Sequence, residues 1–179
     1  MRHVNMALTM VIGILLMVTI TASAHKVKIL DDCDPRDPAW APTGGCTLKE
    51  GNVTFEEFNA ELRSPLAAAV IGHQAWQNDP TYLAIEVGET VRVKNVGGRL
   101  HTFTEVEDFG GGRIPNPDLN FGLTPAPECL QPSTTDIAPA NTLKVKDLSL
   151  GNHRFQCCIH PWMRTLIKVV PEEDDKHDH

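Results

Sequence analysis

The stretch FQCCIHPWMR, residues 155 to 164, carries two adjacent cysteines at the end of a predicted strand. Successive side chains of a strand point to opposite faces, so Cys157 and Cys158 must enter different surroundings. Phe155 favours burial and lies on the same face as Cys157. We therefore expect Cys157 to point into the core, and we expect Cys158 to begin a loop and to point elsewhere.

Cys157, His160 and Met163 follow the spacing C-x2-H-x2-M. A thiolate, an imidazole and a thioether at this spacing can converge on one ion if the loop folds back. Together with a second histidine they make the ligand set of blue-copper sites, in which methionine is a weak axial ligand. His101 is the best candidate for that histidine, because it lies in a predicted strand that could neighbour the Cys157 strand. Zinc is less favoured, since zinc sites typically use paired cysteine or histidine elements and no methionine.

Asn95 stands six residues before His101, and this N-x5-H pattern, followed by C-x2-H-P-x-M, resembles the ligand pattern of the cupredoxins. The short ligand loop is most similar to those of plastocyanin and amicyanin, and the resemblance covers residues 80 to 171. It implies a Greek-key β-sandwich, single-electron transfer, and a role for Asn95 in tying the ligand strands together. It also implies one type 1 copper ion, buried at one end of the sandwich and held by His101, Cys157, His160 and Met163.

The loop that contains His160 also suggests where a partner docks. If the ring edge of His160 reaches the surface, it is the natural electron port. Pro161 and Trp162 would then form an apolar docking patch for a protein redox partner, with a small and transient interface. The alternative is that Trp162 simply packs against the core.

The chain has five cysteines, an odd number, so one thiol is left over if the rest pair. If Cys157 is a copper ligand, the remaining four allow three pairings. We favour a Cys33–Cys46 bridge, because these residues are close in sequence. We also favour a Cys129–Cys158 bridge, which would pin the long insertion at residues 108–140 to the ligand loop.

Alternating apolar and polar residues predict short strands from residue 81 onward. The predicted strands are TYLAIEV, TVRVKNV, LHTFTEV, NTLKVKDL, NHRFQC and RTLIKVV. Short strands separated by turn signals indicate an all-β sandwich and not βαβ units. The 108–140 insertion is rich in Gly and Pro, and we expect it to be a surface loop.

Residues 1–24 have the features of a signal peptide, with an apolar run too short to span a bilayer and expected cleavage after Ala24. We therefore expect a periplasmic or secreted protein with no stable membrane span in the mature chain. Residues 25–77 are predicted to be an N-terminal extension with a disulfide loop and short helices. Residues 78–171 are predicted to be the cupredoxin domain, followed by an acidic, His-containing tail at 172–179.

Two helices are expected within the extension. Thr54 and Glu57 fit a capping box at the start of a helix over residues 54–62. A second short helix is plausible over residues 66–72. No chemistry can be assigned to this part of the chain from its residues.

The chain carries 16 Lys and Arg against 23 Asp and Glu, a formal net charge of −7. This balance argues against nucleic acid as a partner, because nucleic-acid binding needs basic surface. The predicted function is single-electron transport between redox partners. It is not enzymatic, since a single copper of this kind has no open position for substrate. Alternatives are a periplasmic copper carrier or storage protein with the same ligands, and a metal-free binding module that works through the extension.

Overall fold

The computed structural model describes residues 25–64 and 72–172 of the 179-residue chain. The predicted signal peptide with its cleavage after Ala24, nearly all of the second predicted helix, and the tail from residue 173 onward lie outside the described residues. None of the helices in the described ranges is both long and apolar enough to cross a membrane.

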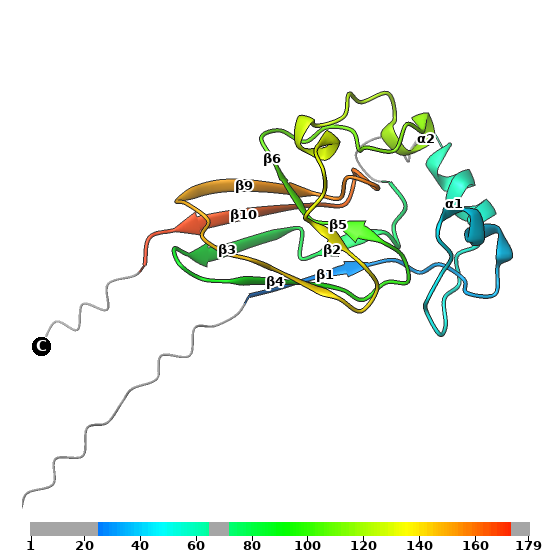
Figure 1. The fold of residues 1–179 in the computed structure, drawn as a ribbon, viewed down its shortest axis with the longest axis horizontal. Coiled ribbons are helices and arrows are strands. Elements are labelled where there is room, and N and C mark those ends of the chain that lie inside the picture. The colour runs from blue at the N-terminus through cyan, green and yellow to red at the C-terminus, as the bar shows by residue number, and fades with distance from the viewer. Residues whose placement is uncertain (1–24, 65–71, 173–179) are drawn as a thin grey trace, which may run out of the picture.

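Two four-stranded sheets form the body of the molecule (Figure 1). The first has the order β2-β1-β4-β8, with strands Gln77–Asp79, His25–Leu30, Val91–Asn95 and Thr142–Val145. The second has the order β3-β10-β9-β6, with strands Tyr82–Glu86, Arg164–Val170, Gly151–Gln156 and Thr104–Val106. A separate short pair consists of β5 (His101–Thr102) and β7 (Asp136–Ile137).

The core lies between the two sheets because each strand places apolar residues on one face. In β4, Val91 and Val93 are fully buried, whereas Arg92 and Lys94 between them are exposed. One continuous core cluster joins residues from both sheets. Consecutive strands β3 and β4 lie in different sheets, as do β8 and β9, and such crossings are a feature of Greek-key sandwiches. The predicted all-β sandwich is confirmed.

Residues 25–30 differ from the domain division drawn from the sequence, which placed them in the N-terminal extension. They form β1, which pairs parallel to β4 from His25 opposite Val91 to Ile29 opposite Asn95. Val27 and Ile29 are fully buried between exposed lysines, so the segment has the two-residue period of a strand. β1 is therefore a strand of the first sheet.

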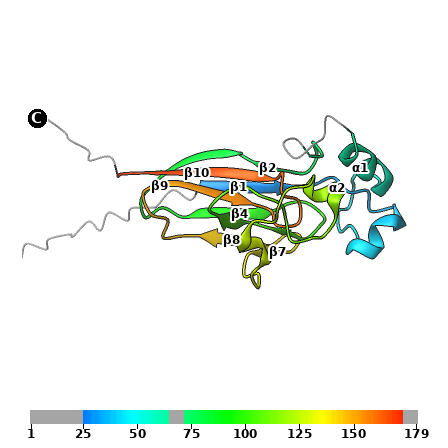
Figure 2. The same ribbon diagram turned by 90° about the horizontal axis from the view of Figure 1, so that it is seen from above.

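The helical elements of the extension cover one end of the sandwich (Figures 1 and 2). They are the 3-10 helix η1 (Pro38–Thr43) and the helix α1 (Phe55–Leu62). The expected capping box is present, because Thr54 accepts a hydrogen bond from the Glu57 amide and the Glu57 side chain accepts one from the Thr54 amide. Trp40 of η1 and Phe58 of α1 are buried, with ring centroids 5.4 Å apart.

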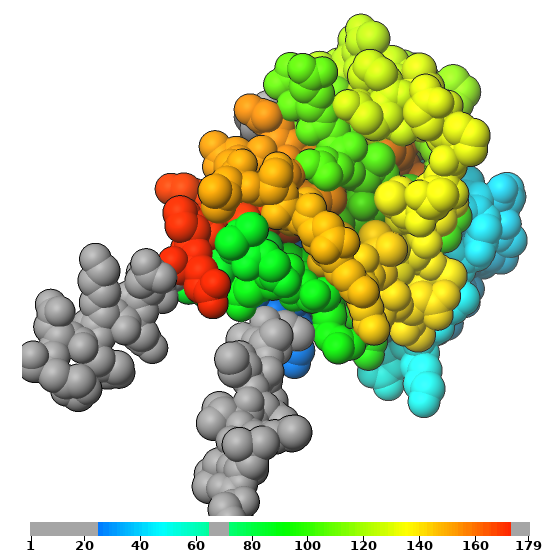
Figure 3. Space-filling model, turned by 60° about the vertical axis from the view of Figure 1, so that its left-hand side comes forward, coloured from blue at the N-terminus to red at the C-terminus, as the bar shows by residue number. Residues whose placement is uncertain are grey.

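The 108–140 insertion is not a loop throughout. It contains the short helix α2 (Pro117–Asn120), the 3-10 helix η2 (Pro127–Leu130) and strand β7, which pairs with β5. Figure 3 shows the yellow surface of the insertion beside the cyan surface of the extension. Arg63, just after α1, donates to Asp118 of α2 at 2.8 Å, so the extension and the insertion are joined directly.

Two disulfides fasten these additions to the sandwich. They are Cys33–Cys46 in the extension and Cys129–Cys158 between the insertion and the ligand loop. These are the two pairings favoured from the sequence. Gly98 packs on the first bridge so closely that a Cβ atom there would lie 2.8 Å from the Cys33 sulfur. The Gly-Gly pair after β4 therefore allows the extension to approach the sheet.

We predict that Thr54→Ala lowers the free energy of unfolding by about 1 kcal/mol, the usual cost of losing an N-cap side chain. The reason is that the Glu57 amide loses its acceptor at the start of α1. Urea unfolding of the mature protein measures the change. Thr54→Ser is the matched control, because serine keeps the capping oxygen, and an equal loss in both variants would contradict the capping role.

Candidate metal centre

Three buried side chains from distant parts of the chain meet at the end of the sandwich that carries the extension. The Cys157 sulfur lies 3.8 Å from Nδ1 of His101 and 3.8 Å from Nδ1 of His160. All three ligand atoms lie within 4.8 Å of one another. Within the described residues, no other group of three or more His, Cys, Asp and Glu side chains gathers in this way.

The ligand loop between β9 and β10 folds back on itself, as the spacing requires. The Cys157 amide donates to the Met163 carbonyl at 3.0 Å, and the Met163 amide donates to the His160 carbonyl at 2.9 Å. Met163 is buried, with 1% of its surface exposed. The loop is therefore closed by its own backbone at the point where β9 ends and β10 begins.

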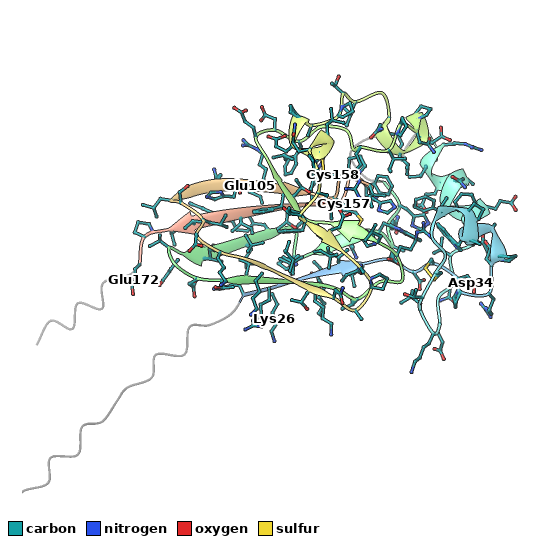
Figure 4. All side chains as sticks on the ribbon, in the orientation of Figure 1. Lys26, Asp34, Glu105, Cys157, Cys158 and Glu172 are labelled. Atoms are coloured by element: carbon teal, nitrogen blue, oxygen red, sulfur yellow. A yellow bond between two sulfur atoms is a disulfide. The ribbon has the colours of Figure 1, made fainter. Side chains whose placement is uncertain are left out.

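The adjacent cysteines enter different surroundings, as the alternation of a strand predicts. Cys157 belongs to the main core cluster, whereas Cys158 belongs to a second, smaller cluster with Cys129. Figure 4 labels both residues where β9 ends, on the side of the molecule toward the extension. Cys157 is the one free cysteine in the described part of the chain.

Thr102 holds the two cysteines in place from β5. Its backbone amide donates to the Cys157 sulfur at 3.4 Å. Its hydroxyl accepts a hydrogen bond from the Cys158 amide at 2.7 Å. Because Thr102 directly follows His101, the same short strand fixes both the ring and the sulfur that face each other.

Asp31 holds the far side of the His101 ring. Its carboxylate lies 2.8 Å from Nε2 of His101, and neither side chain has any exposed surface. The carboxylate also accepts hydrogen bonds from the backbone amides of Gly98 and Arg99, at 2.8 and 3.1 Å. With its Nε2 atom engaged by Asp31, the ring directs Nδ1 at the Cys157 sulfur.

The charges of this group are coupled. Burial alone would lower the pKa of His101, but hydrogen bonds to Asp31 and Cys157 raise that pKa to about 9. Burial would raise the pKa of Cys157, but hydrogen bonds from the two histidines hold it well below its usual value. Burial and the charge of His101 keep the pKa of His160 below its ordinary value, although Cys157 opposes them. The protonation of each of these three side chains therefore depends on that of the other two.

Asn95 ties together the segments around His101. Its side-chain amide donates to the carbonyls of Arg99 and Ile137, at 2.7 and 2.8 Å. Its side-chain oxygen accepts from the Gly97 amide at 3.0 Å. Asn95 thus links the end of β4, the following turn and strand β7, which is paired with His101.

The residues of the expected docking patch are buried in this structure. His160 is 4% exposed, Trp162 is 7% exposed, and Pro161 is also buried. The Trp162 indole N–H donates to the Trp76 carbonyl at 3.0 Å. The ring centroids of Trp162 and Phe58 are 6.2 Å apart. The extension covers the loop that would otherwise have been the surface, which the spacing of the loop residues could not reveal.

Sequence reasoning missed Asp31 and Thr102. Asp31 follows an alternating segment, HKVKIL, whose strand character could have been recognised. The contact between Asp31 and His101 could not have been recognised, because it depends on the parallel pairing of β1 with β4. The only sequence signal for Thr102 was its position next to His101, a candidate ligand.

The donor set fits a bound metal ion. With metal–ligand bonds of about 2.3 Å to sulfur and about 2.0 Å to nitrogen, two ligands of one ion stand roughly 3.5 to 3.8 Å apart. Both observed Nδ1–sulfur distances are 3.8 Å. One thiolate and two imidazoles, with a methionine in the same loop, are donors that suit copper.

No protein-family model and no curated protein matches the chain. Among solved structures, a purple cupredoxin from Nitrosopumilus maritimus is 16% identical, with a TM-score of 0.41, covering 82% of this chain and 99% of that one. An oxidised plastocyanin from Dryopteris crassirhizoma is 15% identical, with a TM-score of 0.40, covering 81% and 99%. A reduced amicyanin variant is 19% identical, with a TM-score of 0.34, covering 50% and 70%. In structure, the chain is thus similar to cupredoxins.

Proposed function

We propose that the chain is an exported type 1 copper protein that carries single electrons between protein redox partners. One observation carries the proposal: a buried cysteine sulfur faces Nδ1 of two buried histidines, both at 3.8 Å. His101, Cys157, His160 and Met163 would hold the ion. When bound, copper would supply a one-electron couple, since thiolate and thioether suit the reduced ion and imidazole and thiolate the oxidised one.

The surrounding residues are arranged to keep the ligands still. Asn95 and Thr102 attach the His101 strand to its neighbours, and the Cys129–Cys158 bridge fixes the residue next to the thiolate. All three side chains of the His-Cys-His group are buried, so their contact with bulk water is small. A site held in this way can change its charge with little movement of the chain.

An electron carrier fits this site better than an enzyme or a delivery protein. Four ligands leave no open position for a substrate. The alternative function, copper carriage or storage, requires ligands that an acceptor protein can replace one after another. The burial of His101, Cys157 and His160 disfavours such exchange.

Export is also part of the proposal. Two disulfides suit an oxidising compartment, such as the periplasm or the exterior of the cell. The apolar N-terminal run and the expected cleavage after Ala24 would direct the chain there. N-terminal sequencing of the protein recovered from its own cells would test the cleavage point.

We predict that the copper-loaded protein has an intense visible thiolate-to-copper band and cycles reversibly by one electron. Cys157→Ser should abolish the band, and His101→Ala should weaken or shift it strongly, because each removes a ligand. Visible and paramagnetic resonance spectra measure both effects. The matched control is His153→Ala, which removes a histidine bonded to Glu105 at 2.6 Å and outside the site. Copper binding without the band, followed by transfer of the ion to an apo-acceptor, would favour the delivery function instead.

We predict that Asp31→Asn raises the reduction potential of the copper-loaded protein. A carboxylate bonded to the far nitrogen makes an imidazole a more basic ligand, which favours the more highly charged ion. We expect the ratio of Cu(II) to Cu(I) affinity to fall about tenfold, which corresponds to about 59 mV for one electron. Protein-film voltammetry measures the potential.

Asp118→Asn is the control for this prediction, because Asp118 pairs with Arg63 near the protein surface. Asparagine has the shape of aspartate, and its one side-chain oxygen can keep one of the two backbone hydrogen bonds, from Gly98 or from Arg99. Urea unfolding of Asp31→Asn checks that the fold persists. An unchanged or lowered potential in Asp31→Asn would contradict the role given to the carboxylate.

A further inference from the structure

A cavity of about 280 Å³ lies beside His160, between the extension and the 108–140 insertion. Figure 1 shows α1 and α2, which border it, next to each other at the end of the sandwich. Most of its lining is apolar. The lining includes Trp40, Phe55, Phe58, Leu119 and Ile159. Binding sites for small molecules are apolar hollows of this kind with a few placed polar groups, and this one lies near the lower end of their size range.

Arg99 is the charged group in the cavity wall. Its guanidinium lies over the Trp40 ring, 4.5 Å from the centroid. One terminal nitrogen donates to the Gly45 carbonyl at 2.6 Å, and the other donates to the carbonyl and hydroxyl of Thr43. These contacts fix the plane of the guanidinium and use both of its terminal nitrogens.

Within the described chain, Arg99 has one hydrogen-bond donor without an acceptor and a positive charge without a direct ion pair. Its Nε–H is buried and has no hydrogen-bond partner there. None of the ion pairs among the described residues includes Arg99, although the side chain is 9% exposed. Burial lowers the pKa of Arg99, and the charge of Asp31 opposes this only in part. A buried cation with no direct ion pair is costly, and a buried donor without an acceptor adds to that cost. The cavity therefore offers an anion a site that the protein itself does not fill.

We infer that this cavity binds a small planar aromatic anion, a carboxylate or phenolate with a single ring. The ring lies among Trp40, Phe58 and Leu119, where aromatic and aliphatic side chains supply the contacts. The anionic oxygen lies in the cavity beside the Arg99 guanidinium, which lines it, and offsets its charge. Charge complementarity selects an anion over a neutral ring, and the aromatic walls select a ring over an inorganic anion.

The inference goes beyond the proposed function and does not depend on it. The cavity and Arg99 belong to the protein without metal, so binding can be measured whether or not copper is held. A ligand in this cavity would nevertheless touch His160, which lines it. The occupant would thus lie against the one ligand ring that the extension hides from a protein partner.

Benzoate, benzamide and phosphate are the probes, titrated into the full mature chain by isothermal calorimetry, first copper-loaded and then metal-free. We expect saturable benzoate binding in both forms. Benzamide, which has the same ring without the charge, should bind at least tenfold more weakly, and phosphate should not compete. Equal affinity for benzamide, or the absence of benzoate binding at about 10 mM, tenfold above a 1 mM Kd, would overturn the inference.

Two variants locate the site. Arg99→Met should weaken benzoate binding at least tenfold. Its matched control is Arg164→Met, which removes another arginine lying over an aromatic ring, Phe109, at 4.9 Å. Leu119→Trp fills the cavity from α2 without altering Arg99, and it should abolish binding even if Arg99→Met does not fold. Full benzoate affinity in Leu119→Trp would place the site elsewhere and refute the proposal.

Discussion

A sulfur anion kept away from water must be satisfied by the protein, and this constraint organises the end of the sandwich. The Cys157 thiolate receives the rings of His101 and His160 and the amide of Thr102. The charge that His101 gains is in turn offset by Asp31, which is as fully buried as the ring. That carboxylate reaches the site only because β1 runs parallel to β4. The parallel pairing of β1 with β4 is therefore a condition for the arrangement of the His-Cys-His group as much as for the fold.

The N-terminal extension packs over the site and buries His160. Trp40 stacks on Trp76, and Phe58 packs at an angle against both. Phe58 and Trp162 also pack edge-on beside His160. Residues without readable chemistry in the sequence thus decide what can reach the ligand ring. The residues of the expected docking patch are buried in this arrangement, and a small cavity beside Arg99 lies next to His160.

The parts of the structure that could be predicted from sequence are those encoded locally. The alternation of β4, the capping box of α1 and the opposite directions of Cys157 and Cys158 follow from the conformations of neighbouring residues. The wrong or missing parts depend on contacts between distant segments. Asp31 meets His101 across 70 positions, and the Trp162 indole donates to the Trp76 carbonyl across 86 positions. Apolar spacing can show that a residue is suited to burial, but it cannot show which segment will cover it.

Because Cys157 and Cys158 are adjacent, the order of folding and disulfide formation matters. Of two neighbouring thiols, one must become oxidised with Cys129 while the other stays reduced and available. In the folded chain, Thr102 and the two imidazoles surround Cys157 and protect it from oxidation. The unfolded chain lacks this protection. In a chain oxidised before it folds, Cys157 can form the bridge in place of Cys158, and the His-Cys-His group then lacks its free thiol.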